Sequence, residues 1–257
     1  MLAHVLALDF PPVSHLLRWP NFWLTNNKYF AINKVVLEMW LAVAIVLAFY
    51  FVAARRKSLV PTGVQNVAEM AIDFIQEGII LQTMGPEGLA WTPFLLMLFS
   101  FIFVLNAFEI IPFIQMPVTA RMALPMFMAL LVWVLYNGFG IASQGPWGYL
   151  KSSVAPPGVP KAMYLLVVPI EFVTHFFVKP FALALRVFAN LLAGHLILVT
   201  FAVLSTALFT ATKVGEVLPG ALLIALTGFE LLVSFLQAYI FTILTAVFIG
   251  GAMHPEH

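Results

Sequence analysis

Residues 169–205 read PIEFVTHFFVKPFALALRVFANLLAGHLILVTFAVLS, a stretch that is almost wholly apolar. Arg186 stands near its middle, and further polar residues are spaced along it: Glu171, His175, Lys179, Asn190 and His195. A guanidinium near the centre of a bilayer costs on the order of 3 kcal/mol on insertion scales, so it needs a compensating interaction. The helix face that carries Arg186 offers no evident carboxylate, and we therefore interpret Arg186 as a functional residue.

The whole chain has the composition of an integral membrane protein. Of its 257 residues, 63% are hydrophobic and 9% are charged, whereas soluble domains are roughly 45–50% apolar and about 25% charged. A net charge of +1 gives no basic surface for nucleic acid, and the absence of cysteine excludes disulfides, thiolate metal sites and thiol nucleophiles. We predict an all-α polytopic membrane protein and expect no cofactor.

Five apolar segments are long enough to cross a bilayer, which takes about 20 helical residues. The predicted spans, within one membrane domain covering residues 1–257, are residues 35–54, 91–111, 122–144, 169–210 and 218–252. The second and third spans should form a hairpin. The last two spans are much longer than a perpendicular crossing needs, so we expect them to be strongly tilted, with a kink at Pro180 as one way to fit. The turn-rich segment 145–161, GPWGYLKSSVAPPGVPK, is predicted to be a loop.

Two segments are predicted to lie outside the bilayer core. Residues 1–33 contain three prolines and a polar cluster, and they are predicted to be an irregular lead-in. Residues 62–81 carry their polar side chains on one helical stripe: Gln65, Glu69, Asp73 and Gln76. This pattern predicts one amphipathic helix along the membrane surface, although an amphipathic helix packed against a soluble partner would show it too.

The cations that follow the first span predict its orientation. Arg55, Arg56 and Lys57 are adjacent at its carboxyl end, and such clusters mark the cytoplasmic side. The amino terminus should then be periplasmic and the carboxyl terminus cytoplasmic.

Helical geometry sorts the intramembrane polar residues into two surfaces. At 100° per residue, His175, Lys179, Arg186 and Asn190 form one stripe, and His195 lies about 180° from Arg186. On the last span, Glu230 and Gln237 share a face. Histidine titrates near neutral pH and a buried carboxyl can be shifted toward it, so His195 and Glu230 can pass protons. Arg186 stays charged and acts as an electrostatic block.

Several of these residues are equally compatible with a structural role. His175, Lys179 and Gln237 could serve only as hydrogen-bonding contacts between helices, and the amine of Lys179 could reach the interface. His195 and Glu230 lack a third nearby ligand, which argues against a metal site.

Two other functions fit the composition. In a proton- or sodium-coupled secondary transporter, Arg186 would bind an anionic substrate, but the chain lacks the internal repeat and broken half-helices typical of many such carriers. An intramembrane hydrolase would need a nucleophile beside a base, and Ser205 lies about 15 Å along the helix from His195.

Three motifs resemble those of one family. The run KPFALALRVFANLLAGHLIL, residues 179–198, closely resembles the signature of subunit a of F-type ATP synthases, the membrane stator that faces the rotating c-ring. The run ELLVSFLQAYIFTILTAVFIGGA, residues 230–252, resembles the last helix of that family. The segment NAFEIIPF, residues 106–113, is similar to the one before the family's lumenal loop. The likeness extends in order along the whole chain.

The resemblance implies a stator subunit of a proton-translocating rotary ATP synthase, with no catalytic activity of its own. It implies that Arg186 and Asn190 face the carboxylate of the c-ring. The implied outer half-channel comprises His195, Glu230, Gln237, Glu109 and Asn106, and the implied inner half-channel comprises Glu171 and His175. In many bacterial members the acid is on the first of the two helices and the histidine on the second, and here they are exchanged, as in mitochondrial-type members.

The resemblance also implies partners and a location. We expect the c-ring, the peripheral-stalk subunit b and lipid as partners, with protons as the transported ion. The rotor carboxylate is not part of this chain, so the chain should not translocate protons alone. The expected location is a bacterial plasma membrane, with the mitochondrial inner membrane as the alternative.

Overall fold

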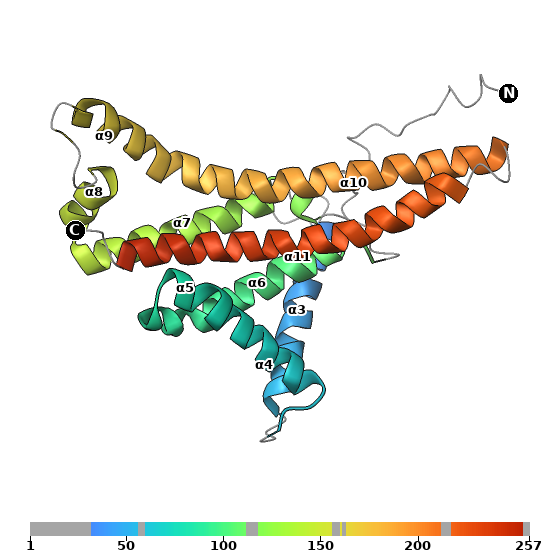
Figure 1. Ribbon diagram of the computed structural model, residues 1–257, viewed down its shortest axis with the longest axis horizontal. Helices are drawn as coiled ribbons and strands as arrows, with labels where there is room; N and C mark the ends of the chain where they lie inside the picture. Colours follow the sequence, from blue (N-terminus) through green and yellow to red (C-terminus); the bar gives the residue numbers. More distant parts are fainter. Residues whose placement is uncertain are drawn as a thin grey trace.

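The structure is a computed structural model, which describes residues 32–55, 60–111, 118–155, 160, 163–211 and 217–253. The predicted lead-in therefore lies outside the described residues except for its last two positions, as do Arg56 and Lys57 of the cationic triplet. The described chain forms helices joined by short connections (Figure 1).

Within the described residues, five helices are long and apolar enough to cross a membrane: residues 34–55, 86–107, 123–144, 164–206 and 220–253. This finding confirms the predicted all-α polytopic fold. In chain order the elements are α3 (Lys34–Arg55), α4 (Val64–Ile75), the π-helix η1 (Gln76–Ile80), α5 (Leu81–Thr83), the 3-10 helix η2 (Pro86–Trp91), α6 (Thr92–Ala107), the 3-10 helix η3 (Val118–Ala120), α7 (Ala123–Gln144), α8 (Pro146–Val154), α9 (Tyr164–Val173), the π-helix η5 (Thr174–Val178), α10 (Lys179–Ala211) and α11 (Val217–Met253).

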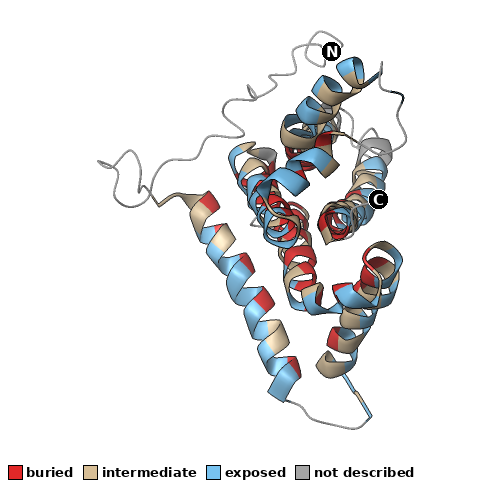
Figure 2. Cartoon of the chain, turned by 90° about the vertical axis from the view of Figure 1, so that its left-hand side faces the viewer, coloured by how far each residue is buried: buried red, intermediate tan, exposed pale blue. Residues whose placement is uncertain are grey.

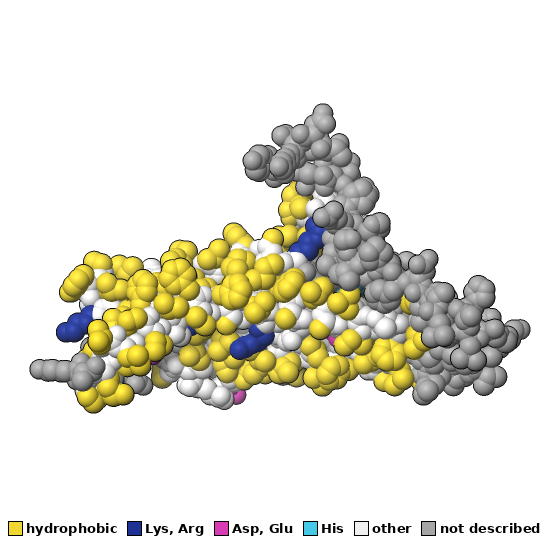
Figure 3. All heavy atoms as spheres, turned by 90° about the horizontal axis from the view of Figure 1, so that it is seen from above, with side chains coloured by type: hydrophobic (Ala, Val, Ile, Leu, Met, Phe, Trp, Pro, Cys, Tyr) yellow, Lys and Arg dark blue, Asp and Glu magenta, His cyan; other side chains and the backbone are white. Residues whose placement is uncertain are grey.

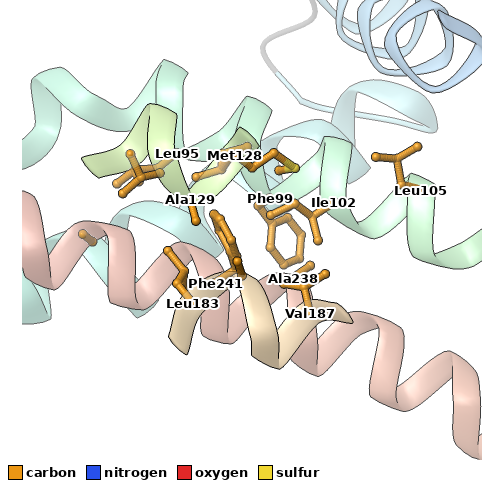
Figure 4. Packing of buried hydrophobic residues seen from close by; sticks show 14 of the residues in the cluster. Leu95, Phe99, Ile102, Leu105, Met128, Ala129, Leu183, Val187, Ala238 and Phe241 are labelled. Atoms are coloured by element: carbon orange, nitrogen blue, oxygen red, sulfur yellow. The ribbon is translucent and has the colours of Figure 1, made fainter. Parts of the chain in front are cut away.

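The core lies where α6, α7, α10 and α11 meet. In Figure 1, α10 and α11 run side by side along the long axis of the molecule, and α6 and α7 pack against them. Figure 4 shows the contact between the four helices, made by Leu95, Phe99, Ile102, Leu105, Met128, Ala129, Leu183, Val187, Ala238 and Phe241. Helix α3 stands at the edge and is exposed over much of its length (Figure 2). Its exposed residues are mostly apolar, as a lipid-facing helix requires.

The segment from α4 to α5 packs across the spanning helices. Ala68 and Ile75 of α4 are buried, whereas Asp73 is exposed, which agrees with the amphipathic pattern of its sequence. At its far end the segment approaches α11 so closely that a Cβ on Gly250 would lie 2.9 Å from the carbonyl oxygen of Thr83. Only glycine permits this contact between two backbones.

The predicted loop at residues 145–161 was wrong, because α8 occupies much of it. Gly145 has φ +74° and ends α7, and Pro146 then occupies the first turn of α8, where its missing N–H costs nothing. Tyr149 of α8 packs its ring into the space left by the absent side chain of Gly140. Glycine and proline at 145–146 therefore mark a boundary between two helices.

The chain from Tyr164 to Ala211 is helical throughout, with a π-turn in the middle. The N–H of Lys179 bonds to the carbonyl of Thr174, five residues back. In this register the carbonyl of His175 would need the N–H of residue 180, which is a proline and has none. The hydroxyl of Tyr136 donates to that carbonyl instead, at 3.0 Å. The kink expected at Pro180 thus takes the form of a π-turn, and the helix axis bends between α9 and α10 (Figure 1).

Candidate functional site

Arg186 lies on the exposed face of α10. Its neighbours Phe181 and Leu185 are 50% and 41% exposed. On the face of the molecule drawn in Figure 3, cationic side chains are surrounded by hydrophobic ones. Within the described part of the chain, Arg186 makes no hydrogen bond or ion pair. The guanidinium is therefore exposed on the surface of α10, with no compensating charge among the described residues.

Small residues flank Arg186 on the same face. Ala182, Ala189 and Ala193 are all exposed and recur at the spacing of helical turns. Alanine side chains let a second helix approach closely in a membrane. This face of α10 is therefore flat, with one cation standing on it.

One turn beyond Arg186, Asn190 joins α10 to α11. Its Nδ2 donates to Oε1 of Gln237 at 2.8 Å. Asn190 is exposed, whereas Gln237 is only 1% exposed and its Nε2 has no hydrogen-bond partner among the described residues. The bond couples the exposed face near Arg186 to the buried interface between the two helices.

A second cluster forms between the end of α6, α10 and α11, and we call it the Glu109 cluster (Glu109, His195 and Glu230). Glu109 follows α6 and is 4% exposed, and its Oε1 lies 3.3 Å from Nδ1 of His195 without hydrogen-bond geometry. Burial raises the pKa of Glu109, and the neighbouring imidazole opposes that shift. A carboxyl group whose pKa is raised beside an imidazole is better suited to proton exchange than a freely solvated one.

Glu230 completes the Glu109 cluster from α11. Its carboxylate occupies the space left by Gly194, where a Cβ would collide with it. Glu230 is 5% exposed, its Oε1 has no partner among the described residues, and its charge interacts with Glu109 and His195. The structure therefore brings together two acids and one imidazole from three separate segments.

Asn106 is fully buried beside the Glu109 cluster and forms hydrogen bonds that hold neighbouring segments together. Thr119 of η3 donates to its Oδ1 at 3.0 Å, and its Nδ2 approaches the carbonyl of Ser234 at 3.5 Å. These contacts tie α6 to η3 and α11. Sequence reasoning missed Thr119, because nothing in the pattern around it indicates contact with Asn106.

The third polar region is the His175 cluster (His175, Lys179, Tyr149, Asn137). Nζ of Lys179 lies 3.1 Å from Nδ1 of His175, and the hydroxyl of Tyr149 lies 2.8 Å from Nε2 of the same ring. Tyr149 also donates to Oδ1 of Asn137 at 3.0 Å. Sequence reasoning missed Tyr149 and Asn137, because the glycines and prolines of segment 145–161 predict a loop and Asn137 lies in a charge-free span.

The π-turn η5 brings Glu171 closer to the His175 cluster. In a continuous α-helix, Glu171 and Lys179 would lie about 80° apart around the axis, but the π-turn absorbs one residue and reduces this to about 20°. The charge of Glu171 accordingly acts on the ammonium of Lys179. Single π-turns inside α-helices are often found at functional sites.

The two clusters lie on either side of Arg186 along the long helix. At 1.5 Å per residue, His175 is about 16 Å and His195 about 14 Å from Arg186. Within the described ranges, no three histidine or acidic side chains gather closely enough to hold a metal ion. The arrangement defines a class of protein: a polytopic helical membrane protein with two separate clusters of titratable side chains and, between them along α10, an exposed cation that has no partner among the described residues.

Comparison with known proteins gives the family. The family model of the ATP synthase A chain matches residues 36–250. ATP synthase subunit a of Frankia alni is 42% identical over 229 residues, covering 88% of this chain and 79% of that protein. The subunits a of Rhodococcus erythropolis and Streptomyces lividans are 39% and 33% identical, covering 93% and 96% of this chain and 88% of each relative.

The chain belongs to the ATP synthase subunit a family. It is a multi-pass membrane protein of the F-type ATP synthase, with a role in ion transport and ATP synthesis. This membership counts against the secondary-transporter and hydrolase alternatives.

Proposed function

We propose that this chain is the stator that offers two offset aqueous half-channels to a ring of rotor subunits, with Arg186 as the electrostatic barrier between them. The observation that carries the proposal is the exposed guanidinium of Arg186, which has no partner among the described residues. Since such a charge is costly in lipid and the described residues offer it no partner, we infer that its counter-ion comes from another polypeptide. A carboxylate on each rotor subunit supplies that charge as it passes the alanine-lined face.

Buried polar atoms support the outer half-channel. Both carboxylate oxygens of Glu109, Oε1 of Glu230 and Nε2 of Gln237 are buried without a protein hydrogen bond among the described residues. Buried polar atoms are almost always hydrogen-bonded, to protein or to ordered water. These four atoms, on Glu109 and on two residues of α11, favour a hydrated path that leads protons toward the rotor.

The inner half-channel is assigned to the region of Glu171 and His175. A proton enters through the Glu109 cluster and neutralises a rotor carboxylate, which then turns into the lipid. After nearly a full rotation it reaches the Glu171 side, loses its proton and is attracted as an anion to Arg186. Each charge that crosses 100 mV contributes about 2.3 kcal/mol, so several protons are needed for each ATP.

The partners and orientation follow from the same proposal. The chain requires the c-ring for its rotor carboxylate, and a peripheral-stalk subunit b to hold it against rotation, with lipid over its remaining apolar faces. The relatives named above are bacterial proteins, and Arg55 ends α3 on the side expected to be cytoplasmic. We therefore assign the chain to the plasma membrane, with the amino terminus periplasmic and the carboxyl terminus cytoplasmic.

The test is Arg186→Ala in the assembled synthase, with Arg55→Ala as the matched control. Arg55 is also an exposed cation, but it stacks 4.3 Å from the ring of Phe51 at the end of α3. We expect Arg186→Ala to abolish ATP-driven proton pumping in vesicles while the ring still co-purifies, and Arg55→Ala to retain pumping. Coupled pumping by the Arg186→Ala complex would reject the proposal.

A further inference from the structure

A chain of side-chain hydrogen bonds connects α7, α8, η5 and α10 at the His175 cluster. It runs from Lys179 to His175, then to Tyr149 and Asn137, and ends at the backbone carbonyl of Trp133. Each link measures between 2.7 and 3.1 Å. Two of these links involve imidazole nitrogens, whose protons have to be inferred from their partners.

The carbonyl of Trp133 sets the donor-to-acceptor direction of this series of hydrogen bonds. A carbonyl only accepts, so the group 2.7 Å from it must be the Nδ2 amide of Asn137. The Oδ1 of Asn137 then faces Tyr149, and since this oxygen also only accepts, the hydroxyl of Tyr149 must donate to it. Burial raises the pKa of Tyr149, which keeps that hydroxyl protonated.

The tautomer of His175 follows from that direction. Tyr149 has one hydroxyl proton, already donated to Asn137, so its oxygen must accept from Nε2–H of His175. Nδ1 of His175 is then unprotonated and accepts from the ammonium of Lys179. Protonation of Nδ1 would remove this bond and place two cations about 3 Å apart, so the network keeps His175 neutral.

We propose that Tyr149 is a positioning residue of the inner half-channel, which fixes His175 as the Nε2–H tautomer and thereby anchors the ammonium of Lys179 beside Glu171. This inference rests on the proposed function. The chain of bonds ends in the amide of Asn137, whose N–H protons are not acidic, so it does not conduct protons. Its effect is to hold a cation in place.

An anchored cation matters because lysine is long and flexible. Without the bond to His175, the amine of Lys179 would extend to the interface with water. Held in place, it favours loss of the proton from any carboxyl group that comes within its reach. The proposal therefore assigns Lys179 to proton release on the inner side and leaves Arg186 as the barrier.

The charged and titratable groups around His175 are few among the described residues. Helix α7 contributes Tyr136, whose hydroxyl bonds the His175 carbonyl, and α8 contributes Tyr149 and, exposed two residues later, Lys151. Glu171 comes from α9 and Lys179 from α10. The described end of α11 contributes only the ring of Phe248, 5.4 Å from Nζ of Lys179.

The first experiment reads the tautomer directly. Histidine labelled with ¹⁵N is incorporated into the whole complex, and His175→Gln identifies the His175 signals in the spectrum. We expect a protonated Nε2 and an unprotonated Nδ1, and a mixture of tautomers in Tyr149→Phe. Tyr50→Phe, which loses a comparable 2.8 Å bond to Ser100, should leave the His175 signals unchanged. A protonated Nδ1 in the unaltered protein, or an unchanged tautomer in Tyr149→Phe, overturns the proposal.

The second experiment measures ATP-driven pumping as a function of pH on the inner side. Tyr149→Phe, which releases the anchored ammonium of Lys179, should move the pH of half-maximal pumping upward by about one unit. This is the low end for removing a charge at 4–6 Å. Gly140→Ala should do the same without removing the hydroxyl, because a Cβ there collides with the Tyr149 ring. Gly138→Ala is the control, since a Cβ at that position meets nothing within 4 Å.

The outcomes separate this inference from the proposed function. If Arg186→Ala still pumps, the stator role fails whatever Tyr149 does. If Arg186→Ala is inactive but Tyr149→Phe keeps both the tautomer and the pH profile, the positioning role alone is wrong. If Gly140→Ala fails to assemble, Tyr149→Phe decides the question by itself.

Discussion

Gly194→Ala should disable the outer half-channel by displacing one carboxylate. A Cβ at position 194 would lie 2.5 Å from Cδ of Glu230 and closer still to one of its oxygens. Non-bonded carbon atoms prefer about 3.5–4.0 Å, so the carboxyl group has to move by about 1 Å. The displaced carboxyl group belongs to the Glu109 cluster, in which Oε1 of Glu109 and Nδ1 of His195 lie 3.3 Å apart.

The size of the effect follows from that displacement. A shift of about 1 Å in a reacting group costs about 100-fold in rate, so pumping should fall by one to two orders of magnitude. Overpacking a core costs typically 1–3 kcal/mol, and a flexible carboxylate should keep Gly194→Ala at the lower end of that range. Assembly should therefore survive while proton movement does not.

The assay is ATP-driven acidification of vesicles, together with co-purification of the ring as a measure of assembly. Gly228→Ala is the matched control, because a Cβ there meets nothing within 4 Å. Glu230→Asp shortens the side chain and should make room, so Gly194→Ala with Glu230→Asp should be less impaired than the two single effects combined. Equal activity of the Gly194 and Gly228 variants, or strictly additive losses in the double variant, would refute the reasoning.

Two further predictions concern the Glu109 cluster, and a third concerns the contact between α5 and α11. His195→Glu combined with Glu230→His should pump better than either single variant, and adding Glu109→Gln should help further, because a carboxylate at position 195 would face Glu109. Burial raises the pKa of Glu109 above 4.5, so passive proton conductance of the assembled synthase should fall as the outer pH rises through that raised value, and Glu109→Gln should remove this dependence. Gly250→Ala should destabilise the solubilised complex by about 1–3 kcal/mol in thermal unfolding, since its Cβ meets a backbone carbonyl of α5, whereas Gly251→Ala should be neutral.

Hydrophobic length alone predicted the number of spanning helices, because a bilayer demands a run of about 20 apolar residues whatever the tertiary contacts are. The same reasoning singled out Arg186, since a guanidinium in an apolar helix is costly wherever that helix packs. Both inferences depend on local sequence and on the solvent, and on nothing else.

Contacts between helices could not be predicted in this way. The bond from Asn190 to Gln237 and the approach of Glu109 to His195 depend on how three helices are rotated and staggered against one another. The helix α8 was missed because glycine and proline punctuate loops and helix ends alike. Because α8 was not predicted, the hydrogen bond between Tyr149 and His175 could not be predicted either.

The π-turn η5 has a consequence for how this gene can change. A surplus residue in a bilayer cannot bulge into lipid, because its backbone polar groups would have no partner there, whereas a widened turn accommodates it within the helix. Loss of one codon between positions 174 and 178 would restore a uniform α-helix and turn Tyr164–Val173 by about 100° relative to α10. Homologues that differ by one residue in this segment should therefore carry their acid one position away from the alignment of Glu171.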